Sequence, residues 1–307
     1  MTLIYHSGEL AVQARAGVQE EAEALGKSIG SIIKPAAKEF LHSQQLAIAS
    51  TIEANGRVWA SLLMGEPGFM QGVAEQRVRI TATPIPGDPL NENLRFRDEM
   101  GILAIDLATR RRLRLNGRAE MQPDCGIDLH TQQVYFNCPK YIQARHLDTA
   151  ATKLPVVPEI RHTKTLTSEQ QHWIAQVDTF FIASFHPESG ADASHRGGYP
   201  GFVRILNASQ LVFPDYSGNN MFNTLGNIAV NPFSGLLFID FEQGNSLQLT
   251  GKACVVWDAE PAKEFAGAER LVEFQINEVI AITGASPLRW RFVEYSHSIQ
   301  TRLNLLR

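Results

Sequence analysis

An internal repeat is the feature that most constrains this fold. Residues 101–119 and 235–253 align without a gap at an offset of 134 residues, with eight identities. The same offset aligns I-A-S at 48–50 with I-A-S at 182–184. Because matches at one spacing extend over so much of the chain, they indicate a duplicated structural unit.

Each copy is predicted to consist of strands with one short helix. Alternating apolar and polar residues predict one β-hairpin per copy, and short apolar runs before Gly-containing turns predict another. The predicted strands are 48–52, 101–107 and 113–121 in the first copy, and 180–185, 235–241 and 246–256 in the second. Helical spacing recurs at 88–97 and 219–230. Many short strands with few helices predict a mainly β fold of two small Greek-key barrels.

The flanking segments are predicted as helices and one linker. Amphipathic patterns predict helices at 8–29, 33–45, 166–176 and 259–283. A Pro- and Thr-rich stretch at 148–165 is typical of a linker. The expected division is a helical amino-terminal arm (1–45), a first barrel (46–150), a linker with a lead-in helix (151–176) and a second barrel (177–307).

Composition excludes several classes of protein. The 307 residues include 28 basic and 32 acidic side chains, so no positive surplus favours nucleic acid. No run of 18 apolar residues predicts a membrane span, and the first residues lack a signal-peptide pattern. Three cysteines without a C-x-x-C pair argue against a disulfide framework or a zinc site. We therefore expect a cytoplasmic protein without a bound metal.

Familiar catalytic motifs fail on their context. G-x-S-x-G at 26–30 follows a helical pattern, whereas a nucleophile elbow needs a strand before the serine. A phosphate loop there would need glycine where Glu21 stands. No H-E-x-x-H occurs, and no G-x-G-x-x-G follows a strand. A hydrolase, a nucleotide hydrolase and a Rossmann dehydrogenase are all disfavoured.

The segment 193–241 carries a family resemblance. It contains A-S-H-R-G-G-Y-P-G-F-V-R-I, then L-V-F-P-D-Y-S-G-N-N-M-F-N-T-L-G-N-I-A-V-N-P, then G-L-L-F-I-D-F. With the hairpin ends L-N-G-R-A and L-T-G-K-A, this resembles the FMN-binding split barrels related to pyridoxamine 5′-phosphate oxidase, over about residues 40–260. Single barrels of that family dimerise, so the resemblance implies two tandem split barrels that form an intrachain pseudo-dimer.

The resemblance implies a set of FMN-binding residues in the second copy. They are Ser194, His195, Arg196 and Gly197 on a strand, and Tyr216, Ser217, Asn219, Asn223 and Thr224 at a turn and helix start. A phosphate favours free backbone N–H groups, a helix amino terminus and a cation. The family's Arg–Lys pair aligns with Asn223 and Thr224, which leaves Arg196 or a residue from elsewhere to supply the charge. An ordinary turn and N-cap remains the alternative for residues 217–220.

Two further candidates lie in the first copy. Arg112, in the arginine run 110–112, matches a position that the family places on the flavin ring, and the run could also recognise an anionic substrate. A solvated turn is the alternative. Lys140 belongs to N-C-P-K-Y at 137–141, which resembles a pattern of the duplicated branch and is predicted to open a helix. The first copy has acids at its helix start and no arginine matching Arg196, so we expect it to be a degenerate phosphate site.

These features predict an FMN-binding oxidoreductase acting on a small-molecule substrate. The catalytic residue stays unknown, with His195 the nearest acid–base candidate. The alternatives are a flavin-binding or sensing module without turnover, or a split barrel that binds deazaflavin or haem. The amino-terminal arm resembles that of proteins fused to a ferredoxin-reductase-like module, so a separate NAD(P)H-dependent reductase is an expected partner. A homodimer is a further expectation.

Overall fold

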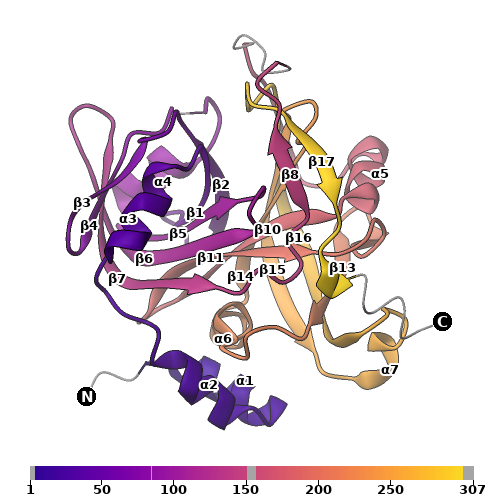
Figure 1. Cartoon of the computed structure of the whole chain (residues 1–307). Helices are drawn as coiled ribbons and strands as arrows, with labels where there is room; N and C mark the ends of the chain where they lie inside the picture. The colour runs from indigo at the N-terminus through magenta and orange to yellow at the C-terminus, as the bar shows by residue number, and fades with distance from the viewer. Residues whose placement is uncertain (1–3, 84, 151–156, 300–307) are drawn as a thin grey trace.

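The computed structural model describes residues 4–83, 85–150 and 157–299, and within them two sheets share one strand order. The first sheet has the order β2-β1-β5-β6-β7-β4-β3 and the second β11-β10-β14-β15-β16-β13-β12. Figure 1 shows the two sheets side by side, the first in indigo to magenta and the second in pink to yellow. The repeat in the sequence is therefore a repeat in the structure, and the chain forms two tandem split barrels that pair as an intrachain pseudo-dimer.

The strands of the first sheet are β1 (Leu46–Ile52), β2 (Val58–Met64), β3 (Met70–Ala74), β4 (Arg77–Ile80), β5 (Glu99–Asp106), β6 (Arg111–Met121) and β7 (Ile127–Asn137). Those of the second are β10 (Thr179–His186), β11 (Gly190–Gly197), β12 (Arg204–Asn207), β13 (Gln210–Tyr216), β14 (Phe233–Ile239), β15 (Ser246–Val256) and β16 (Ala268–Thr283). Outside these runs, β9 (Glu159–Thr163) pairs with β16, and β8 (Ala144–Leu147) pairs with β17 (Trp290–Glu294).

The helices are short and lie around the sheets. They are α1 (Ser7–Ala16), α2 (Gln19–Gly26), α3 (Pro35–His42), α4 (Leu90–Phe96), α5 (Ser168–Gln176), α6 (Asn223–Val230) and α7 (Ala259–Ala262). The predicted helix at 8–29 is two helices, because Gly17 ends α1 in a left-handed conformation with φ 71°. No helix of the described chain is long and apolar enough to cross a membrane.

The predicted hairpins are confirmed, and their registers match between copies. Ile102 on β5 faces Leu115 on β6, and the residues 134 positions later, Leu236 and Leu249, face each other on β14 and β15. Each barrel has its own apolar core, and a third core is shared between them. The duplicated chain thus buries one apolar face of each barrel against the other.

Paired glycines allow the two backbones to approach at this shared face. A Cβ on Gly101 would lie 2.6 Å from the carbonyl oxygen of Ala191, and one on Gly235 would lie 2.7 Å from that of Val58. Since any side chain there would force the barrels apart, the identity of these two aligned glycines has a packing cause.

The prediction of a helix at 259–283 is wrong. Only α7 is helical, and residues 268–283 form β16, which pairs with β13, β15 and β9. Val272, Phe274 and Ile276 alternate with more exposed residues, and this period of two is the strand pattern. Two of its three pairings join segments distant in sequence, so local helical spacing gave a false signal.

Two smaller expectations also change. Residues 137–141 form no helix, because Asn137 ends β7 and Tyr141 adopts φ 67° in a turn. The predicted linker contains β9, while residues 151–156 at its centre lie outside the described residues.

The shared core generates a stability prediction. Phe181 is fully buried in that core, so Phe181→Ala should lower the free energy of unfolding by ~3–5 kcal/mol. Urea denaturation measures this loss. Leu206→Ala, at a half-exposed side chain, is the control and should change stability by at most ~0.5 kcal/mol. Equal losses would show that the shared face is not buried in solution.

Candidate functional site

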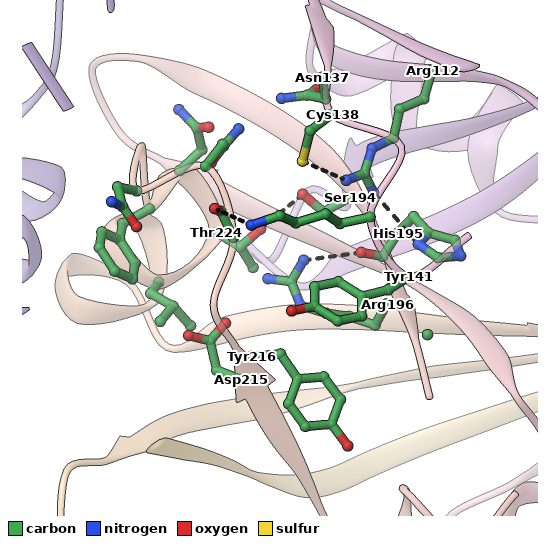
Figure 2. Close-up of a pocket in the computed structure, with 18 of the residues that line it drawn as sticks. Arg112, Asn137, Cys138, Tyr141, Ser194, His195, Arg196, Asp215, Tyr216 and Thr224 are labelled. Atoms are coloured by element: carbon green, nitrogen blue, oxygen red, sulfur yellow. Dashed lines mark hydrogen bonds between the residues drawn. The ribbon is translucent and has the colours of Figure 1, made fainter. Parts of the chain in front are cut away.

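A pocket that is partly open to solvent lies where the two barrels meet. The second barrel supplies β11, β13 and the start of α6, and the first supplies β6 and the segment after β7. Figure 2 shows Arg112, Asn137 and Cys138 on one side of the pocket and Asp215 and Tyr216 on the opposite side. The site therefore needs both copies of the repeat.

The structure brings nearly all predicted site residues to this pocket. Those that line it are Arg112, Lys140, Ser194, His195, Arg196, Gly197, Tyr216, Asn219, Asn223 and Thr224. Ser217 does not line it, and its carbonyl oxygen instead accepts a hydrogen bond of 2.7 Å from the Tyr141 hydroxyl. Residues predicted on separate segments thus share one location.

Arg114 is the central polar side chain of the pocket, and the sequence reasoning missed it. It is buried, and its guanidinium lies 3.2 Å from the Asp192 carboxylate on the other barrel. It donates to Asn223 at 2.8 Å and also to Ser194. Burial lowers the pKa of Arg114, but Asp192, Tyr135 and Glu9 together outweigh that effect, so its pKa is raised and it stays charged.

Ser194 and Thr224 extend this network along the pocket wall. The Thr224 hydroxyl donates to Ser194 Oγ at 2.9 Å, and Ser194 in turn donates to Asp192 at 3.4 Å. Arg114, Ser194 and Thr224 each have at least one partner in this network, which favours one arrangement of the wall.

Besides Arg114 Nε, which lies beside the Asp192 carboxylate, three nitrogens of pocket-lining residues make no hydrogen bond to any described residue. Arg112 Nε, Arg196 Nε and His195 Nε2 are buried and make no hydrogen bond within the described chain. A buried donor without an acceptor costs free energy, so unpaired donors in a native pocket point to an absent ligand. All three side chains belong to residues that line the pocket, so a ligand with acceptor oxygens bound there is a candidate partner for them.

His195 is a neutral donor in this setting. Burial, followed by the charges of Arg112 and Arg196, holds its pKa well below the usual range. Its Nδ1 lies 3.4 Å from Arg112 Nη1, and an arginine can only donate, so the ring proton resides on Nε2. This tautomer assignment follows from the hydrogen-bond geometry and leaves the buried Nε2–H without an acceptor.

The pocket carries positive charge and an open helix start. Arg196 is partly buried. Burial lowers its pKa, and the charge of Asp215 offsets only part of that effect. Lys140 Nζ lies 3.5 Å from the Gly218 carbonyl oxygen, at the rim. No side chain caps α6, whose preceding residue Phe222 has φ 60°. The first backbone N–H groups of α6 are thus available to an anion.

The arginine run does not act as a unit. Arg112 lines the pocket, but Arg110 donates to the Ile142 carbonyl oxygen and to Glu294 at 2.8 Å. Arg111 lies over the rings of Phe40 and Phe136. Side chains alternate along a strand, so residues 112 and 114 share the pocket face and 111 does not. Of the run, Arg112 is therefore the residue that lines the pocket, and the R-x-R spacing was the signal for Arg114.

The equivalent place in the first barrel has lost this charge. The pairing of β1 with β2 and of β10 with β11 puts Leu62 where Ser194 stands and Met64 where Arg196 stands. Gln248, the counterpart of Arg114, donates to Asp88 at 2.9 Å. Burial raises the pKa of Asp88 to about 6. An apolar lining with one buried acid does not suit a phosphate.

The described residues contain no cluster of His, Cys, Asp or Glu that could hold a metal ion. Residues 166–286 match the model of the family described as pyridoxamine 5′-phosphate oxidase. The matched segment contains β11, β13 and α6, which supply the strands and the helix start of the pocket. The resemblance to pyridoxamine 5′-phosphate oxidase that the sequence showed is confirmed for this segment.

Solved structures with similarity to this chain include HupZ from Group A Streptococcus, with 12% identity, 37% of this chain and 92% of that chain covered, and a TM-score of 0.32. The FAD binding protein from Mycobacterium smegmatis has 16% identity, coverages of 39% and 98%, and a TM-score of 0.28. General Stress Protein 26 from Bacillus anthracis has 12% identity, coverages of 41% and 97%, and a TM-score of 0.29. A search of curated proteins gave no significant match.

The buried ion pair generates the next prediction. Arg114→Met leaves the Asp192 carboxylate buried without its partner, so unfolding free energy should fall by ~3–5 kcal/mol at pH 7. Arg111→Ala on the same strand loses only ring contacts and should cost ~0.5–1 kcal/mol. Chemical denaturation compares the two. Similar losses would mean that the ion pair is solvated.

Proposed function

We propose that the pocket between the barrels binds FMN and that the protein is a flavin-dependent oxidoreductase. The observation that carries this proposal is the set of unpaired buried donors on Arg112, Arg196 and His195 around one pocket. A flavin mononucleotide offers phosphate, ribityl and ring acceptors to such donors. The match of residues 166–286 to the pyridoxamine 5′-phosphate oxidase family model supports the same ligand class.

The proposed phosphate site uses Arg196, Lys140 and the first turn of α6. Arg196 supplies the charge that the family's Arg–Lys pair would otherwise provide, and the open helix start supplies backbone N–H groups. Arg114 is already bonded to Asp192, Asn223 and Ser194, so its role is to shape the wall.

The remaining residues would orient and shield the ligand. By the family resemblance Arg112 lies toward the flavin ring, and neutral His195 donates from Nε2. Bound FMN would supply reversible two-electron chemistry, which the protein side chains cannot. A small-molecule substrate, a separate NAD(P)H-dependent reductase and a cytoplasmic setting complete the proposal.

Binding stoichiometry tests the proposal first. We expect one FMN per chain, because only the second-barrel side of the pseudo-dimer retains cations, as measured by fluorescence titration of apoprotein. Riboflavin, which lacks the phosphate, should bind far more weakly, and FAD distinguishes a mononucleotide site from a dinucleotide site. Absence of FMN binding would reject the cofactor, and the absorption spectrum of purified protein would reveal a deazaflavin or haem instead.

Arg196→Ala tests the phosphate assignment. Loss of a charge-assisted hydrogen bond should weaken FMN binding by ~1–3 kcal/mol, with riboflavin binding nearly unchanged. Met64→Leu alters the matching position of the first barrel and should leave FMN affinity unchanged. Equal effects on FMN and riboflavin would move the phosphate away from Arg196.

Turnover separates an oxidoreductase from a binding module. Anaerobic NADPH or NADH, with or without a flavin reductase, should bleach the absorbance of the bound flavin, and a suitable acceptor should restore it. A flavin that stays oxidised under both conditions would favour the module without turnover.

A further inference from the structure

The amino-terminal helix α1 packs directly on α6, the helix whose start lines the pocket. Their closest approach is at two glycines, since a Cβ on Gly8 would lie 2.3 Å from the Gly226 carbonyl oxygen. His6 stacks on His186 with ring centroids 3.8 Å apart, and its Nε2 lies 2.9 Å from Asn227 Oδ1. Figure 1 shows α1 beneath α6, outside both sheets. Specific contacts therefore hold the start of the amino-terminal arm against α6 and His186.

Glu9 carries these contacts to the pocket. The Glu9 residue is 3% exposed, and both of its carboxyl oxygens accept hydrogen bonds. Oε1 accepts from Asn223 Nδ2 at 2.5 Å, and Oε2 accepts from the His6 backbone N–H at 2.9 Å. Because a carboxylate has no hydrogen to donate, it fixes the amide of Asn223 with Nδ2 toward the arm.

That orientation decides what Asn223 presents to the pocket. Its Oδ1 faces the other way and accepts from Arg114 Nη1 at 2.8 Å and from the Tyr135 hydroxyl at 3.2 Å. A flipped amide would place N–H groups against the guanidinium and lose both bonds. The position of Arg114, and the first residue of α6, thus depend on an acceptor in the arm.

We propose that Glu9 is a positioning residue of the pocket, acting through Asn223 on Arg114 and on the start of α6. The inference deepens the FMN proposal and rests on it for the identity of the ligand. It makes the amino-terminal arm part of the binding site, although α1 does not line the pocket.

The charge on Glu9 should make FMN binding depend on pH, which a side chain that only packs would not do. Burial raises the pKa of Glu9 to about 7, so its charge changes near neutral pH. The groups around it hold their state there: His6 has a pKa lowered to about 4 and Tyr5 one raised to about 12, while Arg114 stays charged. Asp192, Tyr135 and His186 complete the ionisable groups on the facing strands; burial raises the pKa of Tyr135 and lowers that of His186.

The negative charge that Glu9 gains sets the direction in which FMN affinity changes with pH. Above pH 7 a charged Glu9 repels an anion in the neighbouring pocket, whereas Glu9→Gln stays neutral. The ratio of the wild-type Kd to the E9Q Kd for FMN should therefore rise between pH 6 and pH 8. The phosphate group of FMN titrates in both proteins and cancels in this ratio.

A double-mutant cycle tests the path through Asn223. Glu9→Ala and Asn223→Ala should each raise the Kd for FMN by about 5- to 10-fold, and the double variant should bind no more weakly than Asn223→Ala alone. Glu9→Gln should restore most of the affinity at pH 6, since its amide oxygen can accept from Asn223. Glu20→Ala, at an exposed position of α2, is the control and should leave the Kd unchanged.

Additive effects, or a flat Kd ratio with pH, would overturn the inference and leave the FMN site standing. If the wild-type protein fails to bind FMN, the proposed function is wrong, and the same cycle is measured with inorganic phosphate. Coupling between residues 9 and 223 toward phosphate would then support the positioning role. Absence of binding to either probe would overturn both proposals.

Discussion

The buried ion pair between Arg114 and Asp192 joins the two halves of this protein. One partner is on β6 of the first barrel and the other on β11 of the second, and both are nearly inaccessible. A buried charge without its partner is costly, so the pair requires the barrels to meet in one register. The same guanidinium holds Ser194 and Asn223. The position of the Arg114 guanidinium therefore links the pocket wall, the start of α6 and, through Asn223, the amino-terminal arm.

Duplication allowed the two equivalent sites to diverge. In an ordinary symmetric dimer both pockets would have the same residues, but here each position exists twice in one chain. Arg114 has Gln248 as its counterpart, and Ser194 has Leu62. One site kept cations and unpaired donors, while the other became apolar around Asp88. The second site retains a packing role, because the Gln248–Asp88 contact still crosses the interface.

Much of the fold could be predicted because its signals are local. The hairpins around Ile102 and Leu236 follow from alternation that each strand carries in its own residues. The strand β16 could not be predicted in this way, since its partners come from distant segments. For the site, a family motif identified Ser194 and Arg196, but Arg114 was missed. Its importance comes from Asp192, which lies 78 positions later and reaches it only through the packing of the barrels.

The sequence by itself determined that the chain is one β unit written twice and that the second copy carries the phosphate-like motif. Periodicity and repetition are properties of the chain order, so they can be read without coordinates. Only the tertiary structure decided that the first copy completes the site of the second and that the arm reaches it through Glu9 and Asn223. Arg114 and Asn223 are 109 positions apart and Glu9 and Asn223 are 214 apart, so these contacts exist only once the apolar faces of the barrels have packed together.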